Sequence, residues 1–183
     1  MTTDVLLPLA IFFALGVPIV ALLWRVFVVG GELRRDAQYG RAALDLARRA
    51  DVSLAELGAV VDDLRRRKAG PDASAASVGA CAEALRRYAV EADVVDKQVP
   101  DPSGAGMRIE IERAQRAVEL IEHGRQLMLE PAAESIAEGE TTVKRGYLNL
   151  THARDAIRTR GAEIAARATA PGPEEPRGPG LGR

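Results

Sequence analysis

The sequence of 183 residues has few of the side chains on which most enzymes and metal sites depend. Its single cysteine, Cys81, excludes an intramolecular disulfide and a cysteine-based zinc site. Its two histidines, His123 and His152, lack the Glu-x-x-His spacing of carboxylate-bridged metal bundles. Aromatic residues make up only 4% of the chain, which is poor for a large aromatic-lined pocket. We therefore predict no metal, no cofactor and no small-molecule substrate.

Charge and catalytic motifs are equally sparse. The formal net charge is −1, so no overall field attracts nucleic acid, and we predict no nucleic-acid partner. The chain has no Gly-x-Ser-x-Gly elbow and no phosphate-binding glycine loop. Cys81 falls on an apolar helical stripe, where a thiol is usually inert. The sequence predicts no enzyme and no catalytic residue, and its abundant alanine, arginine and glycine are typical of a GC-rich bacterial genome.

What the sequence does contain is a long apolar segment near its beginning. Residues 5–23 carry no charged side chain, and the apolar stretch continues to residue 29 with one arginine. About 20 apolar residues span the roughly 30 Å hydrocarbon layer of a bilayer. The segment lacks the polar stripe of a buried soluble helix. A cleaved signal peptide has basic residues before its apolar run, whereas no basic residue precedes this one. We predict an uncleaved transmembrane anchor over residues 5–29, after a short extracytoplasmic segment, residues 1–4.

Basic residues beyond the apolar segment predict its orientation. Arg25 lies near the end of the segment and Arg34 and Arg35 follow it, so the positive-inside rule places the N-terminus outside and the rest of the chain in the cytoplasm. Trp24 and Arg25 are typical of a membrane interface, and Arg34 and Arg35 are close enough to contact anionic headgroups. We therefore predict a single-pass protein of the cell membrane, with the lipid bilayer as one partner and a flexible joint at residues 30–31.

Heptad stripes predict a helical bundle after the anchor. Apolar and small residues alternate at spacings of three and four, which is typical of helices that pack at a shallow angle. Two stripes have this spacing: Gly40, Ala43, Ala47, Ala50, Leu54, Leu57, Val61 and Leu64; then Val78, Cys81, Leu85, Tyr88, Ala92, Val95 and Val99. In the last segment Ile136, Val143, Leu150, Ile157 and Ile164 recur every seven residues. A further amphipathic segment covers about 107–129. We predict an all-α fold: one transmembrane helix, then an antiparallel coiled-coil-like bundle of three to four helices over residues 30–169.

Helix breakers separate these segments. Gly70-Pro71 ends the first segment, residues 99–106 form the clearest loop, and Pro131 favours a short break before the last helix. A capping-box pattern near Asp51 is compatible with one helix ending and another beginning there. The apolar stripe, however, crosses this position without changing phase. The stretch 170–183 is rich in proline and glycine and poor in apolar residues, and predicts a disordered tail.

Residues 138–157 combine features that favour a binding surface. Gly139 and Gly146 interrupt good helix seven residues apart, and therefore lie on one face. Tyr147, Asn149 and His152 follow closely. The simpler interpretation is tight packing of the glycines against another helix. The alternative is that all five residues form a surface for a protein partner.

These observations favour a membrane-anchored helical scaffold or adaptor, or a small subunit of a membrane assembly. Such a protein acts by protein–protein interaction, or by self-association through its helical seams. The alternative is a membrane-tethered signalling module that transmits a change through the joint at residues 30–31. A signalling module requires a ligand outside the cell, whereas only residues 1–4 precede the anchor. The scaffold is therefore the favoured interpretation.

Overall fold

The computed structural model describes residues 37–99, 104 and 106–169. These residues form four helices and no strand, so the prediction of an all-α helical bundle is confirmed. The first helix covers residues 37–65 and is followed by α2 (Pro71–Gln98), α3 (Met107–Leu127) and α4 (Ala133–Thr169). Several predictions fall outside the described residues: the anchor 5–29, the joint 30–31, the tail 170–183, and the interface residues Trp24, Arg25, Arg34 and Arg35.

The four described helices are between 21 and 37 residues long. Within residues 37–99 and 106–169, no helix combines the length and the hydropathy needed to cross a bilayer. The transmembrane segment therefore stays a prediction from the sequence.

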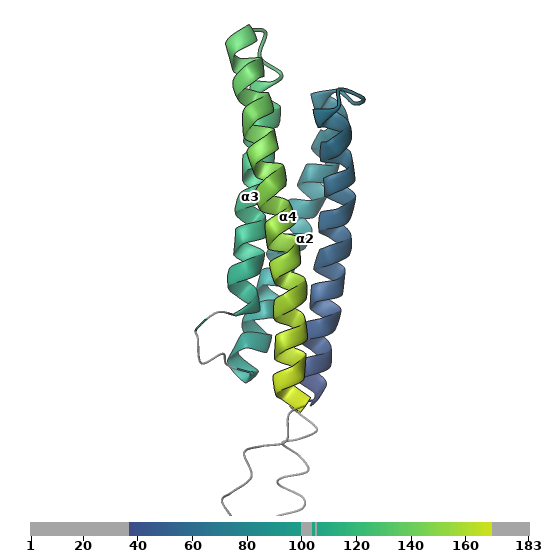
Figure 1. The fold of residues 1–183 in the computed structure, drawn as a ribbon, viewed down its shortest axis with the longest axis vertical. Coiled ribbons are helices and arrows are strands. Elements are labelled where there is room, and N and C mark those ends of the chain that lie inside the picture. The colour runs from purple at the N-terminus through teal and green to yellow at the C-terminus, as the bar shows by residue number, and fades with distance from the viewer. Residues whose placement is uncertain (1–36, 100–103, 105, 170–183) are drawn as a thin grey trace, which may run out of the picture.

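The helices run up and down in an antiparallel bundle (Figure 1). The last helix, α4, closes the bundle by lying beside the first helix: a Cβ atom on Gly40 would lie 2.9 Å from the Cβ of Ala168. Residues 37 and 169 are therefore at the same end, which we call the base. The turns 66–70 and 128–132 lie at the opposite end, which we call the tip, and here the α3–α4 hairpin extends beyond the hairpin of the first helix and α2 (Figure 1).

The heptad stripes form the core. Every predicted stripe residue of the first helix is buried, and the apolar stripe of α2 is buried except for half-buried Tyr88 and for Val99, which follows the helix end. In α4 the four positions Val143, Leu150, Ile157 and Ile164 are buried. Ile136 is only partly buried, because this first turn of α4 lies in the extension beyond the first helix. The predicted periodicity is thus confirmed over most of each stripe.

Helix boundaries follow the breakers closely. The first helix continues through Asp51, so the alternative break there is wrong. Pro71 occupies the first position of α2, where its missing N–H costs nothing, and Gly70 precedes it as the N-cap. The chain leaves helical geometry at residues 128–132, and the short break expected at Pro131 is confirmed.

The start of α3 is held by a carboxylate from α2. Asp96 accepts hydrogen bonds from the backbone N–H groups of Met107 (2.8 Å) and Arg108 (2.9 Å). Gly106, the N-cap residue, has no side chain to do this, and a Cβ atom there would collide with the Asp96 carboxylate. A helix N-terminus exposes unpaired N–H groups and partial positive charge, so this contact joins α2 and α3 at the base.

Candidate functional site

The two glycines of the predicted partner surface are buried inside the bundle. A Cβ atom on Gly139 would lie 2.6 Å from the carbonyl oxygen of Gly124, and one on Gly146 would lie 2.7 Å from Cγ1 of Ile121. Both glycines therefore let the backbones of α3 and α4 approach closely. Neither residue is accessible to a partner while the bundle is folded.

The three other predicted residues lie on two different flanks of α4. Tyr147 is half-buried and faces the first helix, where the guanidinium carbon of Arg65 lies 4.7 Å from its ring centroid. Asn149 and His152 are exposed and line a groove that α4 forms with α3. The structure thus divides the five residues between the bundle interior and two surfaces, and each surface has a groove of its own.

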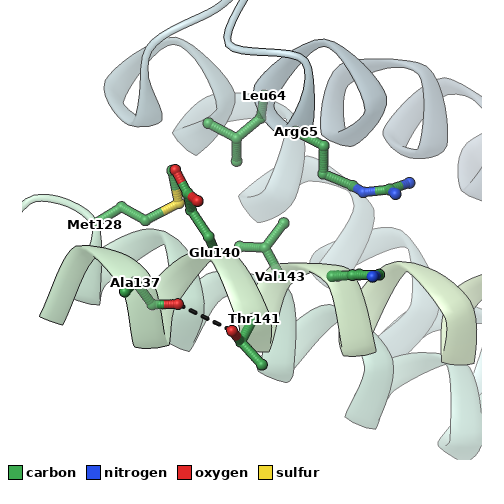
Figure 2. Close-up of a pocket in the computed structure, with 8 residues that line it drawn as sticks. Leu64, Arg65, Met128, Ala137, Glu140, Thr141 and Val143 are labelled. Carbon is green, nitrogen blue, oxygen red and sulfur yellow. Dashed lines mark hydrogen bonds between the residues drawn. The ribbon is translucent and has the colours of Figure 1, made fainter. Parts of the chain in front are cut away.

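One groove lies between the first helix and α4, where the α3–α4 hairpin extends past the first helix (Figure 2). We call it the tip groove, and its volume is about 450 Å³. Leu64 from the end of the first helix and Val143 from α4 extend toward one another across it (Figure 2). Its full lining is Leu64, Arg65, Met128, Ala137, Glu140, Thr141, Val143 and Lys144. The groove lies where the α3–α4 hairpin extends beyond the end of the first helix, and Leu64 and Val143 at its floor are each only 1% exposed.

The rim of the tip groove is polar and its charges are of both signs. Glu140 accepts a 2.6 Å ion-paired hydrogen bond from Arg67, and the Thr141 hydroxyl donates to the carbonyl oxygen of Ala137 at 3.0 Å. Arg65 stacks on Tyr147 just outside the groove. An apolar floor inside such a rim suits an aliphatic side chain delivered by another protein. Met128 belongs to the amphipathic segment predicted over about 107–129, but nothing in the heptad pattern indicates that Glu140 and Thr141 would border a hollow.

The second hollow, which we call the side groove, has a volume of about 460 Å³ and runs between α3 and α4. It is lined by Glu110, Arg113, Arg116, Ala117, Asn149, His152, Ala153 and Ala156. Glu110 is only 5% exposed and accepts hydrogen bonds from Nη1 of Arg113 at 2.8 and 2.9 Å. Arg113 and Arg116 were not among the residues predicted from the sequence; their spacing of three residues, which puts both on one helix face, is the signal that could have indicated them.

Two further features of the bundle carry structural roles. Cys81 is buried, and burial together with the charge of Glu56 raises the pKa of its thiol to about 11, so the reactive thiolate is scarce at neutral pH. Asp51 accepts a 2.6 Å hydrogen bond from Nε of Arg154, which holds the pKa of this carboxyl below its usual range and joins the first helix to α4. Among the described residues, no group of His, Cys, Asp and Glu side chains is arranged to hold a metal ion.

Within the described residues, every buried side-chain nitrogen or oxygen has a hydrogen-bond partner. The unused side-chain polar groups of the described residues are therefore at the surface, and the tip groove and the side groove are each lined by side chains from different helices. No protein family, no curated protein and no solved structure matches this chain.

Proposed function

We propose that this protein is a membrane-anchored helical scaffold or adaptor that presents a binding site to a protein partner at the tip of its bundle. The observation that carries the proposal is the unequal length of the two helical hairpins, which leaves the tip groove open above the end of the first helix. The core below the groove is closed by the heptad stripes, so those seams are already occupied within the chain.

The position of the groove suits an adaptor. The proposed anchor, residues 5–29, precedes the base of the bundle by a few residues, and the tip lies at the other end. At 1.5 Å per residue, the first helix alone separates base and tip by about 43 Å over residues 37–65. A site at the tip therefore projects from a membrane at the base and is accessible to a partner in the cytoplasm.

The chemistry of the tip groove selects an apolar anchor residue on the partner. Leu64, Met128 and Val143 supply an aliphatic floor, and burying one leucine-sized side chain from water contributes about 1.5–3 kcal/mol. The charged rim gives orientation more than affinity, because exposed ion pairs contribute only about 0.2–1 kcal/mol each. We therefore expect a modest, specific contact.

The membrane part of the proposal is tested by fractionation. We expect the full chain to remain with membranes after a carbonate wash and a variant lacking residues 5–29 to be released. Orientation is tested with a cysteine introduced at exposed Arg87, because Cys81 itself is buried and resists labelling. Labelling of this cysteine by an impermeant maleimide in intact cells would refute the cytoplasmic location.

The adaptor part is tested by photo-crosslinking from the tip groove in cells. A photoreactive residue at Lys144 is expected to capture one protein partner, whereas the same residue at Arg87, on the outer face of α2, is not. Ala137→Glu places a charge in the groove and should abolish the adduct, and Ala76→Glu, at an exposed site on α2, should leave it intact. Equal adducts from both photoreactive positions, or an unchanged adduct in Ala137→Glu, would refute the tip groove as the binding site.

A further inference from the structure

The side groove between α3 and α4 presents hydrogen-bond donors that the bundle does not use. Arg116 forms no ion pair with any described residue, and its only hydrogen bond runs from Nε to the carbonyl oxygen of Glu112 at 3.3 Å. Asn149 and His152 form no side-chain hydrogen bond within residues 37–99 and 106–169. The guanidinium of Arg116 thus keeps both Nη groups available in the groove, beside the amide and the imidazole from the neighbouring helix.

The single acidic residue that lines the groove does not compensate this charge. Glu110 is 5% exposed, and Arg113 already donates to both of its carboxylate oxygens. Because Glu110 is neutralised by Arg113, the unbalanced charge in the groove is that of Arg116. Carboxylates are the groups that arginine pairs with most strongly, through two parallel hydrogen bonds.

The floor of the groove lets an extended chain lie close to the helices. Ala117 and Ala153 are buried, 1% and 4% exposed, and Ala156 extends the same small-residue surface. No Phe, Tyr or Trp side chain lines the groove, and with Arg113 paired to Glu110 its lining offers one unbalanced positive charge in place of the basic track that follows a nucleic-acid backbone. A peptide backbone needs only shape and a few polar contacts, and the groove supplies both.

The groove is also distant from the end of the bundle that faces the proposed membrane. At 1.5 Å per residue, His152 lies about 25 Å along α4 from Thr169 at the base. Electrostatic attraction to headgroups is screened within about 8 Å at physiological ionic strength. Lipid headgroups at the base are therefore too far away to be the ligand of an upright bundle.

We propose that the side groove binds an acidic segment of a partner protein, with Arg116, Asn149 and His152 as its donors. The proposal goes beyond the adaptor function above, because it stands on a different groove with different chemistry. An aspartate- or glutamate-rich segment lying between α3 and α4 would place one carboxylate on Arg116 and backbone carbonyls on Asn149 and His152.

A fluorescently labelled octaglutamate peptide tests the proposal, with the full chain in a nonionic detergent and anisotropy as the readout. Arg116→Glu should weaken binding about tenfold, because a charge-assisted hydrogen bond is replaced by repulsion. Arg87→Glu is the matched control: it makes the same charge change on exposed α2, and Glu83 lies four residues before it as Glu112 lies before Arg116. Arg87→Glu should bind as the unmodified chain does, and an octaglutamine peptide should not bind.

Each alternative ligand has an outcome that overturns the proposal. Equal weakening by Arg87→Glu would show attraction to the overall surface instead of to the groove. Inorganic phosphate that displaces the peptide at concentrations equal to the peptide's own would show a small-anion site. If phosphatidylglycerol vesicles bind the full chain and Arg116→Glu abolishes this binding, the groove is a lipid site. Unchanged peptide binding in Arg116→Glu, with unchanged circular dichroism, would refute the groove altogether, and none of these results depends on the tip groove.

Discussion

The helices α4 and α2 pack against their neighbours in different ways although both carry the same kind of stripe. Helix α4 brings backbones together: Gly139 and Gly146 lie against α3, and a Cβ atom on Gly161 would lie 2.5 Å from the Cβ of Ala47 in the first helix. Helix α2 instead relies on side chains. Its Glu91 forms a 2.5 Å ion pair with Arg49, and its Asp96 caps α3.

The difference explains why glycines in this chain have unequal importance. Gly79 in α2 has nothing within 4 Å of the position a Cβ would occupy, whereas Gly124 and Gly139 face each other's backbone at 2.8 and 2.6 Å. A backbone atom cannot rotate away as the end of a side chain can, so an added methyl group must separate the helices. The interfaces of α4 are therefore expected to tolerate substitution much less than those of α2.

The largest expected effect is at the glycine contact between α3 and α4. Gly139→Ala should lower the free energy of unfolding by about 1–3 kcal/mol, because the methyl group overpacks a seam whose neighbour is backbone. Thermal unfolding of the full chain in mild detergent, followed by circular dichroism at 222 nm, measures the change.

The control for this substitution is Gly79→Ala in α2. The added methyl group meets open space there and improves helix propensity, so stability should rise by about 0.5–1 kcal/mol. If both substitutions changed stability in the same direction, the contrast between the α4 and α2 interfaces would be wrong.

A smaller loss is expected where α2 caps α3. Asp96→Ala leaves the N–H groups of Met107 and Arg108 without their acceptor and should cost about 1 kcal/mol, typical of a lost N-cap. Hydrogen exchange should accelerate most in the first turn of α3. Asp63→Ala, at an exposed position of the first helix, is the control and should leave exchange in α3 unchanged. Faster exchange spread evenly over the bundle would contradict a local capping role.

The smallest expected effect depends on pH and lies between the first helix and α4. Since Arg154 lowers the pKa of Asp51 in the folded state, the ion pair stabilises the bundle above the ordinary carboxyl pKa and loses this contribution as the pH falls through the lowered pKa. Asp51→Asn should cost about 0.2–1 kcal/mol near pH 7. The difference from the unmodified chain should disappear once the pH falls below the lowered pKa of Asp51, and a difference independent of pH would contradict the ion-pair origin.

Much of the secondary structure could be predicted from the residues alone. The alternation of three and four residues in the first helix placed Leu54, Leu57 and Val61 in the core, where they are at most 1% exposed. The same pattern placed Cys81 on the buried face of α2. Spacing works here because burial in a bundle depends on the angle of a side chain around its helix axis, and this angle follows directly from position in the sequence.

The candidate site was predictable only in part. The two glycines of α4 indicated close packing as one of two interpretations, and the structure shows the close contact with α3. The spacing did not reveal that Tyr147 faces the first helix while His152 faces α3. These two residues are near each other in the chain, but which helix covers each flank of α4 is a property of the assembled bundle.

The sequence by itself thus determined the all-α class, the helices between their glycine and proline breakers, and the face that each helix buries. Only the tertiary structure decided where the helices stand relative to one another along the bundle. A heptad stripe specifies a direction around a helix axis but no translation along it, so the extension of the α3–α4 hairpin beyond the first helix has no counterpart in the pattern. That translation opens the tip groove, and the pairing of α3 with α4 brings Arg116 beside Asn149 and His152 in the side groove.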